Sequence, residues 1–256
     1  MCPSPVPSIV HFAWYGIRRP VFRFYHVISV MSTLRFVRPR RIFFWHDREP
    51  RGPWWRFIRQ KINESTTTLV MMQRDPPTKI FDRPIVYDEH KSDVVRLEAM
   101  VRYGGIYHDL DVVIVRSLDP LYCYETTLGE ELPNWLCNGF MMAVPNATFL
   151  RLWYEQYHSF NAYNWNFHSV VVPGMLAKSH PDLVHVEKDS IHKPNWEHLD
   201  QLYKPGHLYD WKSHNYAVHL WYRKYNVYHT PDTIRQLNTT MGQIFRFIYY
   251  GKSAMM

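Results

Sequence analysis

Two adjacent glycines, Gly104 and Gly105, lie in the stretch that most limits how this chain can fold, and no other glycine pair occurs in the sequence. Glycine tolerates a positive φ, so the pair predicts a tight turn. Apolar residues precede it at helical spacing: Val94, Leu97 and Val101. Ser92 or Asp93 can cap the first free amides of that helix. Residues 106–115 are rich in β-branched and apolar side chains, which indicates a buried strand.

Two carboxylates, Asp109 and Asp111, interrupt the apolar run that follows the turn. In an extended strand residues i and i+2 face the same side, so these side chains are expected to converge. Two buried like charges repel unless a cation lies beside them. Mg²⁺ and Mn²⁺ prefer such oxygen ligands. The alternative is a strand end whose acids face water.

Apolar runs and helical patterns alternate along the chain. In the first half the pattern predicts strands at residues 8–14, 41–46 and 67–72 and a helix at residues 20–37. In the second half it predicts strands at residues 137–144 and 217–221 and helices at residues 146–157 and 231–251. Such alternation is typical of a mostly parallel sheet covered by helices. Ligands of these sheets bind at the carboxyl ends of the strands, where the two acids fall.

Asp93 and Arg96 are three residues apart and therefore share one helix face. The run Ser-Asp-x-x-Arg followed by Tyr-Gly-Gly-Ile-Tyr-x-Asp-x-Asp resembles the sugar-binding region of DXD-containing glycosyltransferases. These include α-1,4-galactosyl- and α-1,4-N-acetylglucosaminyltransferases and the yeast initiating α-1,6-mannosyltransferase. The resemblance implies an α/β, GT-A-like fold, that of the nucleotide-diphospho-sugar transferases, with a mostly parallel central sheet flanked by helices. It implies one catalytic domain over residues 1–256, with a Pro-rich lead at 1–7 and a C-terminal helix at 231–251.

By the same resemblance the chain is expected to be a metal-dependent, retaining hexosyltransferase. The implied catalytic residues are Asp93, Arg96, Asp109 and Asp111. The implied donor-binding residues are His11, Trp14, Ser92, Asp93, Arg96, Tyr107, Asp109, Asn138 and Trp221. The implied ligands of Mn²⁺ or Mg²⁺ are Asp109, Asp111 and His219. For the tryptophans and histidines among these residues, the alternative to a role in the site is a structural role in the hydrophobic core. His108 stands where relatives often carry a small or apolar residue, which bears on the choice of donor.

The implied partners are a nucleotide-diphosphate sugar, with a UDP-sugar preferred to GDP-mannose, and a glycan or glycolipid acceptor. The net charge of +7 also suits nucleic acid, but the basic residues are dispersed in short clusters such as Arg18-Arg19 and Arg223-Lys224, which argues against a nucleic-acid partner. A catalytically silent sugar-nucleotide-binding protein of the same fold is the alternative function. A metal phosphohydrolase would need further His and Asp ligands around a second ion.

The family resemblance implies the Golgi membrane or lumen. Neither a signal peptide nor a membrane anchor is visible in this chain, and the most apolar early stretch, residues 21–34, is too short to span a bilayer. Three Asn-x-Ser/Thr sequons, at Asn63, Asn146 and Asn238, lean toward a secretory route.

The three cysteines are Cys2, Cys123 and Cys137. Cys123 and Cys137 can form a short disulfide loop that leaves Cys2 free, and buried free thiols are the equal alternative. No cysteine and histidine spacing of a zinc motif occurs.

Overall fold

The computed structural model describes residues 5–16, 21–225 and 227–256. Cys2, the Arg18-Arg19 cluster and Pro20, where the first helix was predicted to begin, lie outside the described residues.

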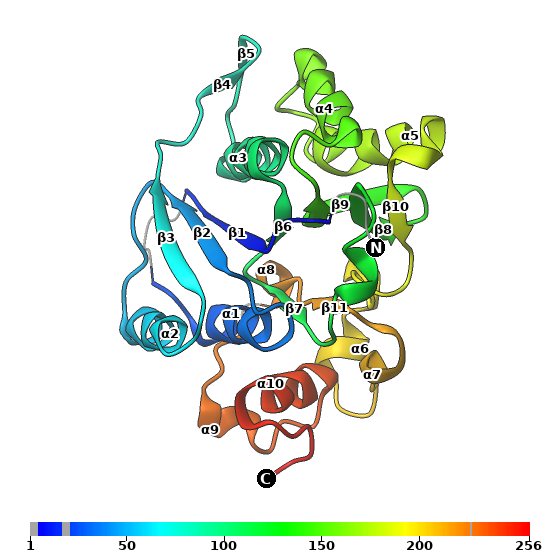
Figure 1. Ribbon diagram of the computed structural model, residues 1–256. Coiled ribbons are helices and arrows are strands. Elements are labelled where there is room, and N and C mark those ends of the chain that lie inside the picture. The colour runs from blue at the N-terminus through cyan, green and yellow to red at the C-terminus, as the bar shows by residue number, and fades with distance from the viewer. Residues whose placement is uncertain (1–4, 17–20, 226) are drawn as a thin grey trace.

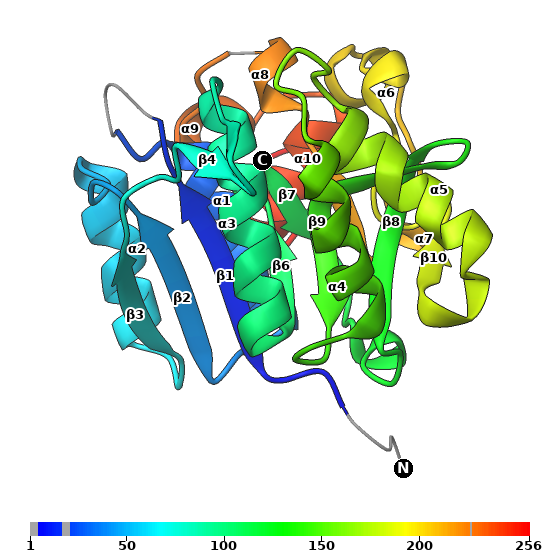
Figure 2. The same ribbon diagram turned by 90° about the horizontal axis from the view of Figure 1, so that it is seen from above.

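A seven-stranded sheet forms the centre of the molecule, in the order β10-β8-β9-β6-β1-β2-β3 (Figures 1 and 2). Its strands are β1 (Ile9–Trp14), β2 (Arg41–His46), β3 (Thr68–Gln73), β6 (Gly105–His108), β8 (Thr126–Leu132), β9 (Trp135–Ala143) and β10 (His185–Glu187). Within this sheet β9 runs antiparallel to β6 and β8, and the other neighbours are parallel. The sequence-based prediction of an α/β, GT-A-like fold with a mostly parallel sheet is confirmed.

Successive residues of the strands enter different cores because side chains alternate across a sheet. Ile106 and Phe44 pack in one core, with residues of the helices α1 (Phe24–Phe36), α2 (Pro53–Asn63) and α10 (Thr240–Tyr250). Tyr107 packs in a second core with residues of α3 (Asp88–Tyr103) and α4 (Thr148–Glu155), and Phe43 in a third cluster that includes residues of α3. Both faces of the sheet are therefore covered, which explains the near-continuous apolar runs of its strands.

Helices lie on both sides of the sheet, as Figure 1 shows edge-on. One side carries α1 (Phe24–Phe36) and α2 (Pro53–Asn63), with α10 (Thr240–Tyr250) packed against α1. The other side carries α3 (Asp88–Tyr103), α4 (Thr148–Glu155) and α5 (Val172–Ser179). Two small sheets pair β11 (Ala217–His219) with β7 (Val112–Ile114), and β4 (Lys79–Ile80) with β5 (Arg83–Pro84). Short helices complete the fold: α6 (Asp200–Tyr203), α7 (Trp211–His214), α8 (Tyr222–Tyr225) and α9 (Pro231–Ile234).

The turn at Gly104 and Gly105 is confirmed, with φ of 58° and 98°. A Cβ at Gly105 would lie 2.5 Å from the carbonyl oxygen of Ile9 in the adjacent strand β1. Only glycine therefore allows both the backbone conformation and the close approach of the two strands.

Apart from shifts of a few residues at the ends of elements, three differences from the sequence-based prediction affect the elements themselves. The single strand expected at 106–115 is two strands, β6 and β7, which belong to different sheets and are separated by residues 109–111. The helix α3 begins at Asp88, so Ser92 and Asp93 lie inside it and do not cap it. Acidic residues in its first turn suit the helix dipole instead. The range 231–251 contains two helices, because Thr239 caps a new helix by accepting from the Gly242 amide.

The disulfide between Cys123 and Cys137 is not formed, because Cys137 is a buried free thiol. In the described ranges we find no helix with the length and apolarity needed to cross a membrane.

Candidate functional site

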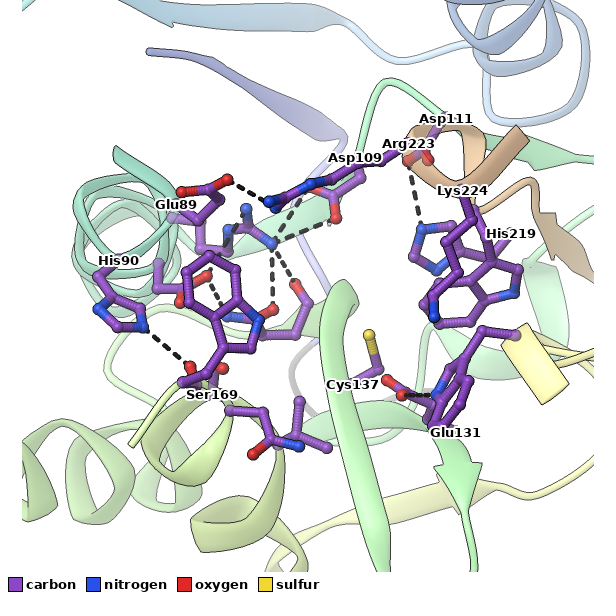
Figure 3. Close-up of a pocket in the computed structure, with 18 residues that line it drawn as sticks. Glu89, His90, Asp109, Asp111, Glu131, Cys137, Ser169, His219, Arg223 and Lys224 are labelled. Atoms are coloured by element: carbon purple, nitrogen blue, oxygen red, sulfur yellow. Dashed lines mark hydrogen bonds and ion pairs between the residues drawn. The ribbon is translucent and has the colours of Figure 1, made fainter. Parts of the chain in front are cut away.

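A cavity of about 660 Å³ opens beside the carboxyl end of β6. Segments far apart in the sequence form its wall: the start of α3, the 109–111 turn, β9, the π-helical turn Phe167–Val171, and the end of β11 with α8 (Figure 3). Its size is typical of a small-molecule site. The cavity brings together side chains that the sequence places more than a hundred residues apart.

Asp109 and Asp111 lie in a tight turn and not in an extended strand. The Val112 amide donates to the Asp109 carbonyl at 2.9 Å, which closes the turn. The Asp109 amide donates to the Gly139 carbonyl of β9 at 2.9 Å, and the Leu220 amide donates to the Asp111 carbonyl at 2.8 Å. The backbone of β9 and of the segment after β11 therefore fixes both acids, and they converge through the turn.

Arg96 connects α3 to the first of these acids. Its guanidinium lies 3.1 Å from Asp109 Oδ1 and donates to the Asn138 side-chain oxygen at 3.1 Å and to the Asn138 carbonyl at 3.2 Å. Its centre also lies 4.6 Å from the centroid of the Tyr107 ring. The buried guanidinium is thus held in one orientation by a carboxylate, an amide and an aromatic face.

Asp93 and Tyr107 complete this network. The Asn138 amide donates to Asp93 Oδ1 at 2.7 Å, and the Tyr107 hydroxyl donates to Asp109 Oδ1 at 2.6 Å. Burial raises the pKa of Asp93, although Arg96 opposes that shift. Asp93 still lines the cavity, so its carboxylate can accept hydrogen bonds from a ligand there.

His219 lies against the second acid. Its Nε2 is 3.2 Å from Asp111 Oδ1, and the Tyr222 amide donates to Asp111 Oδ2 at 3.0 Å. Burial alone would raise the pKa of Asp111, but the neighbouring His219 and the Tyr222 amide lower it to about 2. Burial disfavours the charged form of His219, but the Asp111 carboxylate outweighs it and raises the pKa of the imidazole. Without a bound ion, the Asp111 carboxylate therefore stabilises the protonated form of His219, and His219 stabilises the ionised form of Asp111.

Trp221 covers His219 from one side. The two rings stack with centroids 3.6 Å apart, and Trp221 Nε1 donates to the Pro194 carbonyl at 3.2 Å. Trp221 has a φ of 50°, which is rare for a bulky residue. Such conformations persist where the surroundings hold them, commonly at functional sites.

The acids and His219 fit a divalent ion. Ligand atoms of Asp109, Asp111 and His219 all lie within 4.8 Å of one another. Carboxylate oxygens are hard donors suited to Mg²⁺ or Mn²⁺, and imidazole is acceptable to Mn²⁺.

Four of the expected donor-binding residues do not line this cavity. One is Tyr107, which is buried and contacts Asp109 and Arg96 of the site. His11 is fully buried between the Gly104 carbonyl, 2.9 Å from its Nε2, and the Trp45 indole, which donates to its Nδ1. Trp14 is buried against Phe22 and other aromatic residues of the core. Ser92 is half-buried in α3. Their expected roles in donor binding stay predictions.

His108 also faces away from the cavity. Its Nε2 lies 2.8 Å from the Thr33 hydroxyl of α1, and its Nδ1 lies 3.0 Å from the Asp109 carbonyl. It therefore connects α1 to the 109–111 turn, and its side chain makes these contacts in the interior.

Several cavity residues were not predicted as site residues. Arg223 pairs with Glu89 at 2.6 Å at the cavity mouth, and the Arg223 guanidinium lies 5.4 Å from the Trp165 ring centroid. Lys224 lies 4.5 Å from the Trp196 ring centroid. The sequence showed Arg223 and Lys224 only as a short basic cluster, and their position two and three residues after Trp221 of the His219-x-Trp221 motif was the available signal.

Comparison with known proteins identifies relatives by sequence. The family model described as "Glycosyltransferase sugar-binding region containing DXD motif" matches residues 29–128. The chain is 33% identical over 266 residues to "Glucan organizing enzyme 1" of Cryptococcus neoformans var. grubii, a match that covers 94% of this chain and 70% of the relative. It is 39% identical over 64 residues to "Inositol phosphoceramide mannosyltransferase 3" of Schizosaccharomyces pombe, covering 25% of this chain and 18% of the relative. It is 35% identical over 63 residues to "Mannosyl phosphorylinositol ceramide synthase SUR1" of Saccharomyces cerevisiae, covering 25% and 16%.

Solved structures resemble the chain more distantly. "PaToxG Glycosyltransferase" is 14% identical with a TM-score of 0.49, covering 70% of each chain. The apo form of "glycosyltransferase GlyE" of Streptococcus pneumoniae TIGR4 is 12% identical with a TM-score of 0.44, covering 72% of this chain and 45% of that one.

Proposed function

Because the chain belongs to the glycosyltransferases with a DXD-containing sugar-binding region, we propose that it moves a hexose from a nucleotide-diphosphate sugar to a glycan or glycolipid acceptor. We propose that the reaction needs a divalent ion and retains the anomeric configuration, as the family resemblance implies. The single observation that carries this proposal is the convergence of Asp93, Arg96, Asp109, Asp111 and His219 on one cavity.

The ion would be held by Asp109 and Asp111, with His219 as a further ligand. When bound, Mn²⁺ or Mg²⁺ supplies positive charge against the diphosphate leaving group. The carboxylates are oriented for this role by other residues of the chain. Arg96 and the Tyr107 hydroxyl hold Asp109, and the Tyr222 amide holds Asp111.

The sugar of the donor would lie against Asp93 and Arg96. Asp93 would accept hydrogen bonds from sugar hydroxyls, and the Asn138 side-chain amide fixes its carboxylate. Arg96 donates toward sugar or phosphate oxygens from a guanidinium already held by Asp109 and Asn138. Such prior fixation reduces the entropy that is lost on binding.

Two cations on α8 favour a diphosphate at the mouth of the same cavity. Arg223 and Lys224 line the mouth and are exposed, so they attract an anionic ligand without a large desolvation penalty. Glu89 is the acidic neighbour of Arg223 and competes with the ligand for it.

The identity of the sugar nucleotide that serves as donor is open to a direct test. Two relatives are named as mannosyl-transferring enzymes of inositol phosphoceramide, so GDP-mannose joins the UDP-sugars as a donor to be tested here.

We propose a secretory or Golgi location. In support, the asparagines of all three sequons, Asn63, Asn146 and Asn238, are exposed.

A donor and metal matrix tests the proposal. Purified protein is mixed with UDP-galactose, UDP-N-acetylglucosamine, UDP-glucose or GDP-mannose, each with Mn²⁺, Mg²⁺ or a chelator. We expect one donor to raise the melting temperature and to release nucleoside diphosphate only when a divalent ion is present. Release that is unchanged by the chelator would contradict metal dependence, and no response to any of the four donors would contradict the donor class.

A further inference from the structure

A second cluster of ligand atoms lies behind the carboxylate pair. Cys137 of β9, His192 of the loop after β10, and His219 of β11 are all buried, and their ligand atoms lie within 4.8 Å of one another. Each residue comes from a different segment of the chain. This explains why no zinc-like spacing is visible in the sequence, since the fold alone assembles the cluster.

His192 has no evident structural reason to be a histidine. Its side chain is fully buried, and neither ring nitrogen makes a hydrogen bond of ordinary length and angle within the described part of the chain, although the Cys137 backbone lies near the ring. A buried polar group without a partner costs about 1–3 kcal/mol. A Cβ on Gly129 would lie 2.9 Å from His192 Nε2, so the missing side chain at Gly129 makes the room that this ring occupies. The His192 ring therefore has room in the interior, but its nitrogens lack hydrogen bonds of ordinary geometry.

Ligand atoms of His219 and Cys137 border the same place. The Nε2 of His219 faces Asp111, while its Nδ1 is buried and has no partner among the residues that the structure describes. Cys137 is a free thiol whose Sγ accepts from the Gly139 amide at 3.4 Å. A Cβ on Gly139 would lie 3.3 Å from that Sγ and 3.2 Å from His219 Cε1, so sulfur and imidazole border one small space.

The contact between Asp111 and His219 has a known use in metal centres. A carboxylate that accepts from one nitrogen of a histidine fixes the ring and leaves the other nitrogen free to bind a metal. Asp111 and His219 Nε2 stand in this relation at 3.2 Å, with Nδ1 free. Thiolate and imidazole together favour Zn²⁺ or another thiophilic ion over Mg²⁺ or Mn²⁺.

We propose that Cys137, His192 and His219 bind one thiophilic divalent cation of the Zn²⁺ class, at a site distinct from the Asp109 and Asp111 carboxylates. Cys137 and His219 line the cavity, so a water molecule or a ligand group can take the fourth position (Figure 3). The proposal does not depend on the transfer reaction. A cation in the thiol site would nevertheless affect the transfer reaction, because His219 is a ligand in both sites. A His219 side chain bound at the thiol site is no longer available to the ion at the carboxylate site.

Cobalt substitution tests the site without an activity assay. The purified, metal-free protein is kept reduced and titrated with Co²⁺, and the sulfur-to-cobalt charge-transfer band is recorded in the near ultraviolet. We expect a band that saturates at a single equivalent and is removed by Zn²⁺. A wild-type protein that shows no such band, or a band that Zn²⁺ does not displace, would overturn the proposal.

Matched variants assign the ligands. Cys137→Ser should remove the charge-transfer band, and His192→Asn should weaken Zn²⁺ binding by more than about 10-fold, the smallest loss expected even for an outer-shell partner. His46→Asn is the control, because His46 is also buried with both ring nitrogens unpartnered among the described residues, but belongs to no metal cluster found there. Asp109→Asn should keep the band. The proposal fails if Cys137→Ser and His192→Asn, folded as judged by melting, bind Zn²⁺ like the wild type.

Discussion

The Nε2 of His219 lies 3.2 Å from Oδ1 of Asp111, although more than a hundred residues separate them in the chain. The contact exists because β11 pairs with β7 directly after the 109–111 turn, with His219 opposite Val112. One strand pairing therefore delivers the late His-x-Trp motif to the two acids.

This pair should make the stability of the metal-free protein depend on pH. The pKa of His219 is raised from 6.5, so its contribution is complete below pH 6.5 and is lost as pH rises through the raised pKa. The pKa of Asp111 is lowered from 3.8 to about 2, so its contribution is complete above pH 3.8 and is lost as pH falls toward 2.

The measurement compares melting temperatures of the wild type and His219→Gln in chelator. The wild type should melt higher by a few degrees at about pH 5, since about 1 kcal/mol shifts the melting temperature by about 2–4 °C in chains of this size. The difference should shrink at about pH 9. A difference that stays constant over this range would show that the two side chains do not form an ion pair.

The glycine turn is expected to be sensitive to a single methyl group. Gly105→Ala should lower the free energy of unfolding by more than about 1–3 kcal/mol, because a positive φ is combined with a Cβ only 2.5 Å from the Ile9 carbonyl oxygen. Gly206→Ala is the matched control, with a φ of 81° and nothing within 4 Å of the added Cβ. Chemical denaturation measures both variants. Equal losses would show that the strand contact at Gly105 adds nothing.

Arg96→Lys keeps the positive charge but loses the fork that contacts Asp109 and Asn138. We expect kcat/KM for the donor to fall about 10- to 100-fold, the effect of losing a hydrogen bond to a charged group. Arg246→Lys is the control, since Arg246 is also buried, donates to the backbone carbonyls of Ile234 and Leu237, and does not line the cavity. It should lower stability and leave the donor KM unchanged. A donor KM that responds equally to both variants would make Arg96 merely structural.

Two substitutions at the cavity mouth should act in opposite directions. Arg223→Ala removes a cation that the proposal places beside the diphosphate and should raise the donor KM several-fold. Glu89→Gln removes the competing acid 2.6 Å from Arg223 and should lower the donor KM. Neither should change the melting temperature by much, because exposed ion pairs contribute about 1 kcal/mol or less. Shifts of the donor KM in the same direction would refute an electrostatic role for this pair.

The sequence predicted the parts of the site that are local. The Gly104-Gly105 turn, the Asp109-x-Asp111 motif, and the strands β1, β2 and β3 follow from short-range patterns, and the structure has them near the predicted positions. The sharp turn at 109–111 was missed because Leu110 continues the apolar pattern of a strand. Patterns of this kind do not reveal which partner completes a turn by hydrogen bonds, here the Gly139 carbonyl.

The long-range contacts of the site could not be predicted from local patterns. Asn138 was expected at the donor site by resemblance, but its link from Asp93 to Arg96 depends on β9 lying beside β6. The cluster of Cys137, His192 and His219 has no sequence spacing at all, because three separate segments supply it.

The central claim is that Asp111 belongs to a metal-dependent transfer site, and one measurement tests it most directly. Release of nucleoside diphosphate is followed for the wild type, Asp111→Asn and the exposed control Asp82→Asn, with the best donor and saturating Mn²⁺. Asp111→Asn removes the charge with little change in volume, so kcat should fall by about 100-fold or more while the protein stays folded. Asp82→Asn should behave as the wild type. Turnover of Asp111→Asn at the wild-type rate, with the same Mn²⁺ requirement, would contradict the account.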